Sequence, residues 1–368
     1  METRKPKLIL MTAFEPSGDA LGAMATHGLK ELNPHCRVVG LGGDLMASAG
    51  VELLAKTTQE AAMGVGAVSE ISRIKKLIEV VGQWIEENKP DVVVAVDSPA
   101  ANWPVCKVAR THGCNVVHLA APKLWAWAPW RIKKLRRLSD HLMCLLPFEP
   151  EWFGQRDMPA TFIGHPALRK SESKHIDLPA GEPNIILLPG SRKSEIRKNL
   201  PMQQEILKRI CAEFPGTEAV IAVRAEDVER VKPYANGLQI VADELPSVLE
   251  WGTLALTVSG TVSLHVMNYG VPMIGMYKVN PISILGAKIM LNTKFCFLPN
   301  LIAGQSIVPE CIPCGNIVSQ LASLSIDLLH DPEALARMRA RLQKEAAVYL
   351  EHDPGKESAE IILRFASK

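Results

Sequence analysis

Short apolar runs alternate with longer segments whose apolar residues recur at helical spacing. In the first half of the chain the apolar runs are KLILMTAF, CRVVGLGG, DVVVAVDS and NVVHLA, at residues 7–14, 36–43, 91–98 and 115–120. Amphipathic segments separate these runs, at 17–32, 71–88 and 103–110. Apolar strands that are each followed by a helix are typical of a parallel sheet with both faces covered.

The pattern pauses at the polar segment 171–184, which contains Pro and Gly, and then restarts. The second half has apolar runs at 185–191, 218–224, 238–243 and 254–260, with a long helical segment at 195–213. The sequence therefore predicts an α/β chain of two doubly wound, Rossmann-like domains, with the active site in the cleft between them. We expect an N-terminal domain over 1–170, a linker over 171–184, a C-terminal domain over 185–345, and a final helix over 346–368 that could pack back on the first domain.

Length, charge and cysteine content narrow the functional class. The chain has 368 residues, a formal net charge of +2 and eight cysteines in apolar contexts. The charge excludes a globally basic nucleic-acid binder, and the cysteines suit a reducing cytoplasm. Cys311 and Cys314 have no second pair beside them, so we expect neither a metal nor a cofactor. No apolar stretch is long enough to span a membrane, so any membrane contact would be peripheral.

Two motifs in the first half follow apolar runs. EPSGD, from Glu15 to Asp19, follows the first run, and Gly18 would let the backbone approach a ligand. VDSPAAN, from Asp97 to Asn102, follows a later run. A carboxylate held at such a strand end could take a proton from an acceptor hydroxyl. The alternatives are structural, with Asp19 as a charge at a helix start and Asp97 as a helix cap.

Two turns in the second half are candidate phosphate sites. LPGSRKSEIRKN combines a glycine turn with a basic helix start, where Ser191 can cap the helix and Arg192 can bind a phosphate. SGTVSLH places Ser259, Gly260 and Thr261 between an apolar run and another helix start, which favours an anion. A solvated basic turn is the alternative for the first. No Asp-x-Asp occurs, so the leaving group would be neutralised without a metal bridge.

The segment KLWAWAPWRIKKLRR, residues 123–137, has the composition of an interfacial membrane segment. Its candidate membrane contacts are Trp125, Trp127, Trp130, Arg131, Lys133 and Lys134. A helix with buried tryptophans and a solvated basic face explains the same composition.

Together these blocks resemble the lipid-A-disaccharide synthase family of inverting glycosyltransferases, which have the two-domain glycosyltransferase-B fold. The matching blocks include EPSGDALGA, AVDSP, WAWAPWRIKKLRR, LLPGSR, SGT and LPNLIAG. The resemblance implies transfer from a UDP-linked 2,3-diacylglucosamine to 2,3-diacylglucosamine-1-phosphate, with release of UDP, in the cytoplasm at the inner face of the bacterial inner membrane. It implies contact with the lipids of that surface and no nucleic acid, and it leaves a homodimer open.

The resemblance also implies roles for individual residues. Asp97 would be the base, with Glu15 and Asp19 as further catalytic residues. The substrate-binding set would be Ser17, Gly18, Asn102, Ser191, Arg192, Ser259, Gly260, Thr261, His265 and Asn300.

Four positions depart from the family pattern: Phe14, Ala100, His265 and Gln305. His265 stands where the family has a glutamate that would hold the ribose hydroxyls, and a neutral histidine can accept only one hydrogen bond. Two alternatives therefore stay open, a paralogue that uses a different UDP-sugar and a catalytically silent member that binds lipid or nucleotide. A third is an enzyme of the same fold with a different reaction, such as an epimerase acting on UDP-N-acetylglucosamine, and the block WAWAPWRIKKLRR argues against it.

Overall fold

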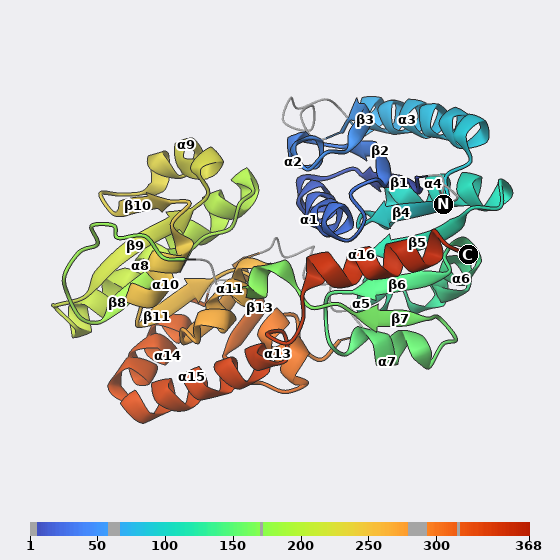
Figure 1. Cartoon of the computed structure of the whole chain (residues 1–368). Coiled ribbons are helices and arrows are strands. Elements are labelled where there is room, and N and C mark those ends of the chain that lie inside the picture. Colours follow the sequence, from blue (N-terminus) through green and yellow to red (C-terminus); the bar gives the residue numbers. More distant parts are fainter. Residues whose placement is uncertain (1–5, 58–66, 170–171, 279–292, 315–316) are drawn as a thin grey trace. The chain divides into compact units, whose positions relative to one another are not determined.

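The chain divides into two compact units in a computed structural model that describes residues 6–57, 67–169, 172–278, 293–314 and 317–368 (Figure 1). The first unit runs to Pro166 and takes in Glu351–Lys368, and the second unit is Ala167–Leu350. Each unit is a parallel sheet covered by helices, so the α/β class predicted from the alternating pattern is confirmed.

The first unit contains a sheet of seven parallel strands in the order β3-β2-β1-β4-β5-β6-β7. The strands are β1 (Leu8–Ala13), β2 (Arg37–Gly42), β3 (Glu52–Lys56), β4 (Val92–Val96), β5 (Asn115–Leu119), β6 (His141–Cys144) and β7 (Ala160–Phe162). The helices are α1 (Pro16–Leu32), α2 (Asp44–Ser48), α3 (Ala67–Asn88), α4 (Pro99–Thr111), α5 (Leu124–Trp127), α6 (Ile132–Leu138), α7 (Glu149–Gly154) and α16 (Pro354–Phe365).

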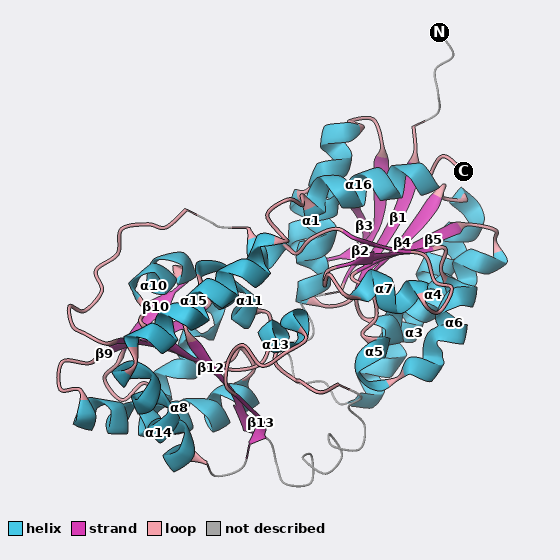
Figure 2. Cartoon of the chain, turned by 90° about the horizontal axis from the view of Figure 1, so that it is seen from below, coloured by secondary structure: helices cyan, strands magenta, loops and turns pink. Residues whose placement is uncertain are grey.

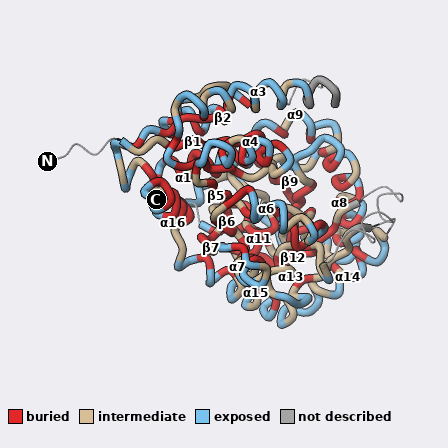
Figure 3. Tube along the Cα trace, turned by 90° about the vertical axis from the view of Figure 1, so that its right-hand side faces the viewer, coloured by how far each residue is buried: buried red, intermediate tan, exposed pale blue. Residues whose placement is uncertain are grey.

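Strand β4 shows why the apolar runs have no polar alternation. Val92, Val94 and Val96 pack into a core with residues of α1 and α16. Val93 and Ala95 pack into a second core with residues of α3 and α4. Both faces of the strand are buried, as Figures 2 and 3 show for the sheet between its helical layers.

The C-terminal helix α16 belongs to the first unit. It packs along α1, where an added Cβ at Gly28 would lie 2.3 Å from the Gly355 carbonyl oxygen. The side chain of Asp353 caps its start by accepting from the backbone N–H groups of Gly355 and Lys356. The helix thus starts at Pro354 rather than at the expected residue 346, because α15 continues to Ala347.

The second unit contains a sheet of six parallel strands in the order β10-β9-β8-β11-β12-β13. The strands are β8 (Asn184–Leu188), β9 (Glu218–Val223), β10 (Gln239–Ala242), β11 (Leu254–Thr257), β12 (Met273–Lys278) and β13 (Glu310–Cys314). The helices are α8 (Lys193–Glu213), α9 (Val228–Val231), α10 (Leu245–Trp251), α11 (Val262–Tyr269), α13 (Leu298–Ala303), α14 (Val318–His330) and α15 (Pro332–Ala347). Because all strands are parallel, the turns after β8, β9 and β11 lie at one edge of this sheet.

Candidate functional site

The turn after β4 holds Asp97 in an unusual backbone conformation. Asp97 and Ser98 have φ values of 50° and 39°, a left-handed region that costs about 1–3 kcal/mol for a residue other than glycine. The buried amide of Asn102 donates to the carbonyl oxygens of Val96 and Asp97, at 2.9 and 2.8 Å. The hydroxyl of Thr12 donates to Asn102 Oδ1 at 2.6 Å. Asn102 therefore positions Asp97, which corrects the expectation that its side chain touches substrate.

The carboxylate of Asp97 is half-buried and accessible. Ser17 Oγ donates to Asp97 Oδ2 at 3.3 Å, so the start of α1 and the end of β4 meet at this group. Glu15 precedes α1 as an exposed N-cap residue. Gly18 is buried, and an added Cβ would lie 3.2 Å from Ala13 Cβ, so this glycine serves the packing of α1 on the sheet. Three predicted residues, Glu15, Ser17 and Asp97, thus lie at one strand edge.

Asp19 has a structural task. Its carboxylate is buried and accepts from the backbone N–H groups of Gly43, Leu45 and Met46, at 2.7, 3.2 and 3.0 Å. These bonds cap the start of α2. This buried carboxylate thus holds the start of α2, and a catalytic role for Asp19 stays a prediction.

The turn after β8 is organised by Glu195, a residue that we did not single out from the sequence. The buried Glu195 carboxylate accepts from the backbone N–H groups of Ser191 and Arg192, at 3.2 and 3.3 Å. It also accepts from Arg192 Nη1 at 2.9 Å and from the Tyr277 hydroxyl at 3.1 Å. Arg192, not Ser191, is the N-cap residue of α8, so the expected Ser191 cap is wrong. The three-residue spacing of Arg192 and Glu195 is that of a capping box and could have revealed this contact.

Arg192 remains reachable by a ligand, because its side chain is 78% exposed. Gly190 has a φ of 101°, and an added Cβ would lie 2.6 Å from Glu195 Oε2, so the turn requires glycine. Burial and the neighbouring Glu195 carboxylate raise the pKa of the Tyr277 hydroxyl, which keeps it protonated and donating.

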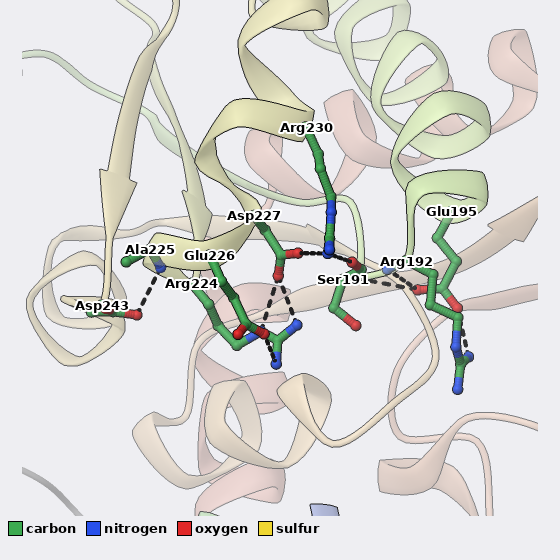
Figure 4. Close-up of polar contacts among 9 residues, drawn as sticks. All are labelled: Ser191, Arg192, Glu195, Arg224, Ala225, Glu226, Asp227, Arg230 and Asp243. Carbon is green, nitrogen blue, oxygen red and sulfur yellow. Dashed lines mark hydrogen bonds and ion pairs between the residues drawn. The ribbon is translucent and has the colours of Figure 1, made fainter. Parts of the chain in front are cut away.

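The turn after β9 adds charged residues that the sequence pattern did not reveal. Asp227, which is 1% exposed, forms ion pairs with Arg224 and Arg230 (Figure 4). Arg230 also reaches the turn after β8, where its Nη1 lies 3.4 Å from the Ser191 carbonyl oxygen. Asp243, at the end of β10, accepts from the backbone N–H of Ala225. The turns that follow three strands of this sheet thus carry an interlocked polar cluster.

The predicted SGT turn follows β11 at the same edge. Ser259 Oγ donates to the Cys296 carbonyl oxygen at 3.0 Å, and Thr261 is the exposed N-cap residue of α11. An added Cβ at Gly260 would meet no atom of the described residues within 4 Å. His265 lies one turn into α11 and is half-buried. Burial lowers the pKa of His265, so its ring is neutral at pH 7.

Asn300 does not face a ligand. Its buried amide donates to the Val308 carbonyl oxygen and to Glu310 Oε2, both at 2.9 Å. Its Oδ1 accepts from the backbone N–H groups of Ile307 and Val308. These four bonds hold the segment between α13 and β13, so the expected substrate contact of Asn300 is wrong.

The tryptophan-rich segment divides into buried and exposed parts. Trp125 is 7% exposed, and its Nε1 donates to buried Glu149 at 3.0 Å, so it is not a membrane contact. Trp127 and Trp130 are 37% and 70% exposed. The guanidinium of Arg131 lies 4.3 Å from the Trp103 ring centroid and 5.4 Å from that of Trp127. Lys133 and Lys134 are exposed, so an aromatic and basic surface remains without Trp125.

Within the described ranges, no group of three or more His, Cys, Asp or Glu side chains could hold a metal ion. The described helices include none that is long and apolar enough to cross a membrane.

Comparison with protein-family models matches residues 9–361 to the model described as lipid-A-disaccharide synthetase. A lipid-A-disaccharide synthase of Gluconobacter oxydans is 33% identical over 354 residues, covering 91% of this chain and 85% of the relative. One from Granulibacter bethesdensis is 30% identical over 357 residues, covering 92% and 90%.

Solved structures resemble the chain in fold. The glycosyltransferase of kitacinnamycin matches with a TM-score of 0.66 at 16% identity, covering 98% of this chain and all of that one. A putative UDP-N-acetylglucosamine 2-epimerase of Listeria monocytogenes matches with a TM-score of 0.60 at 13% identity, covering 98% and 95%. A glycosyltransferase and a putative epimerase thus share this fold, so the fold alone does not identify the reaction. The family match is what indicates a glycosyltransferase.

Proposed function

Because this chain belongs to the lipid-A-disaccharide synthase family, a family of glycosyltransferases of lipid A biosynthesis, we propose that it joins UDP-2,3-diacylglucosamine to 2,3-diacylglucosamine-1-phosphate with inversion. The products are lipid A disaccharide-1-phosphate and UDP. The observation that carries the proposal is the strained, accessible Asp97 at the end of β4, held by Asn102 and in contact with Ser17.

The first unit would bind the acceptor and supply the base. Asp97 would take the proton of the acceptor hydroxyl as its oxygen attacks the anomeric carbon of the donor. The bond from that carbon to the UDP oxygen breaks, and the electron pair leaves on UDP. Ser17 donates to Asp97 Oδ2, which leaves Oδ1 to receive the proton. Strain at Asp97 and Ser98 is typical of a backbone that is held for function.

The second unit would bind the donor and stabilise the leaving diphosphate. Arg192 and the N-terminus of α11 would face the two phosphates, since helix starts and guanidinium groups favour anions. The N–H groups of Ser191 and Arg192 already donate to Glu195, so the phosphates would meet the Arg192 side chain rather than the backbone of that turn. We expect this stabilisation to need no metal.

His265 bears on the identity of the donor. Its neutral ring can form one hydrogen bond to a ribose hydroxyl, whereas a glutamate can accept from two. We therefore propose that UDP binds more weakly than to a glutamate-bearing relative, by about 1–3 kcal/mol. The same observation supports the second candidate function, transfer from a different UDP-sugar.

The acylated substrates would be reached at the inner face of the inner membrane. Trp130 and Trp127 would enter the headgroup region, while Arg131, Lys133 and Lys134 would face anionic lipids. The proposed peripheral contact would then belong to the same unit as the proposed acceptor site.

The proposal is tested by incubating the purified chain with both acylated substrates and measuring UDP and disaccharide-1-phosphate, with and without a strong chelator. We expect the same yield of both products with and without the chelator, and product formation at least about 100-fold slower from Asp97→Asn. Product with another UDP-sugar alone would favour the second candidate function. UDP binding without any transfer would favour a silent member.

A further inference from the structure

The peptide group between Ser191 and Arg192 is held from both sides. Its N–H, on Arg192, donates to Glu195 Oε2 at 3.3 Å. Its carbonyl oxygen, on Ser191, accepts from Arg230 Nη1 at 3.4 Å. In a trans peptide the N–H and C=O point in opposite directions, so the two contacts fix the orientation of the peptide plane. The plane in turn sets the direction in which the Arg192 side chain leaves the turn.

Arg230 is itself held by a buried anion. Its Nη1 donates to Asp227 Oδ1, and Arg224 Nε donates to Asp227 Oδ2 at 2.9 Å. Asp227 is 1% exposed, and an isolated carboxylate in that place would be costly without cationic partners. Figure 4 shows the Arg230 side chain extending from α9 to a position between Asp227 and Ser191. The pair is thus a fixed link between the turn after β9 and the turn after β8.

We propose that Arg230, oriented by Asp227, is a positioning residue for donor binding: it holds the Ser191 carbonyl and so presents Arg192 to the diphosphate. The inference rests on the proposed function, in which Arg192 binds the phosphates of UDP. Arg230 acts through the peptide and not by touching the ligand. Its loss should therefore weaken the binding of the diphosphate and leave the nucleoside part unaffected.

The test compares UDP and uridine binding by calorimetry in the wild-type chain, Arg230→Met and Arg230→Lys. Lys232→Met is the matched control, because Lys232 lies just beyond the same helix and pairs with exposed Glu229. In Arg230→Met we expect UDP affinity to fall about tenfold, the value of one lost hydrogen bond, and uridine affinity to stay constant. Arg230→Lys should recover part of the loss, and Lys232→Met should match the wild type.

Two results would overturn the inference. One is unchanged UDP affinity in Arg230→Met, and the other is an equal loss for UDP and uridine, which would indicate general damage to the unit. If Arg230→Met does not fold, Arg230→Lys decides, since a shortened donor should still weaken UDP and spare uridine. A wild-type chain that does not bind UDP would instead contradict the proposed function.

Discussion

Replacing Asn102 by alanine should release the turn that carries Asp97. The substitution removes the donations to the carbonyl oxygens of Val96 and Asp97 and leaves the Thr12 hydroxyl without its acceptor. Each buried hydrogen bond contributes about 1 kcal/mol, so the free energy of unfolding should fall by about 3 kcal/mol. Relaxation of the left-handed backbone at Asp97 and Ser98 should also move the carboxylate and lower kcat at least about tenfold.

The assay combines urea unfolding with kcat measured at a temperature where the variant is fully folded. Asn115→Ala is the matched control, because this amide donates to the Phe365 carbonyl oxygen from the opposite end of the same sheet. The control should lose about 1 kcal/mol and keep its kcat. Wild-type turnover in folded Asn102→Ala would refute the reasoning, since the turn would then hold its shape without the amide.

Three further predictions concern the ribose contact, the membrane surface and a buried acid. His265→Glu should tighten UDP binding in calorimetry. Unchanged or weaker binding would show that His265 does not contact UDP. Trp130→Ala should reduce sedimentation with anionic vesicles at low salt, while equal sedimentation of the wild type with neutral and anionic vesicles would count against membrane contact. Burial raises the pKa of Glu149 to about 7 from 4.5, so its contribution to stability is full below pH 4.5 and is lost as the pH rises through 7. The Tm of Glu149→Gln should therefore fall less than that of the wild type between pH 5 and 8, and parallel Tm curves would contradict this.

The apolar runs predicted eight of the described strands, because a parallel strand that is buried on both faces is a continuous apolar run in the sequence. Strand β4 was predicted within DVVVAVDS and runs from Val92 to Val96. Five strands lie outside the predicted runs: β3, β6, β7, β12 and β13. Of these, β7 has only three residues, and β13 begins at Glu310 and contains two cysteines and a proline. Such segments become strands through pairing with neighbours that are distant in sequence.

The candidate site was predicted where a polar residue directly follows a strand. That rule located Asp97, Arg192 and Ser259, but it also selected Asp19, which caps a helix from a different part of the chain. Asn300 was selected by resemblance alone, and its amide holds a loop. Position in sequence does not show whether a polar group faces solvent or backbone donors.

The residues that were missed combine local ion pairs with tertiary contacts. Tyr277 meets Glu195, and Arg230 meets Ser191, across turns that are distant in sequence. Glu195 and Asp227 also have arginine partners three residues away, and that spacing was the signal in the sequence. Trp125 and Trp130 show the same limit, because they are close in sequence and differ widely in exposure. The Trp125 indole turns inward, where its Nε1 donates to buried Glu149.

The most direct measurement of the central claim is the turnover of Asp97→Asn with the two acylated substrates. Asparagine keeps the shape of the side chain but cannot take a proton, so kcat should fall at least about 100-fold while UDP affinity stays unchanged. Asp91→Asn is the control, since Asp91 lies just before β4, where it accepts from the Leu8 backbone N–H. The account predicts wild-type turnover in that control, and near-wild-type turnover in Asp97→Asn would contradict it.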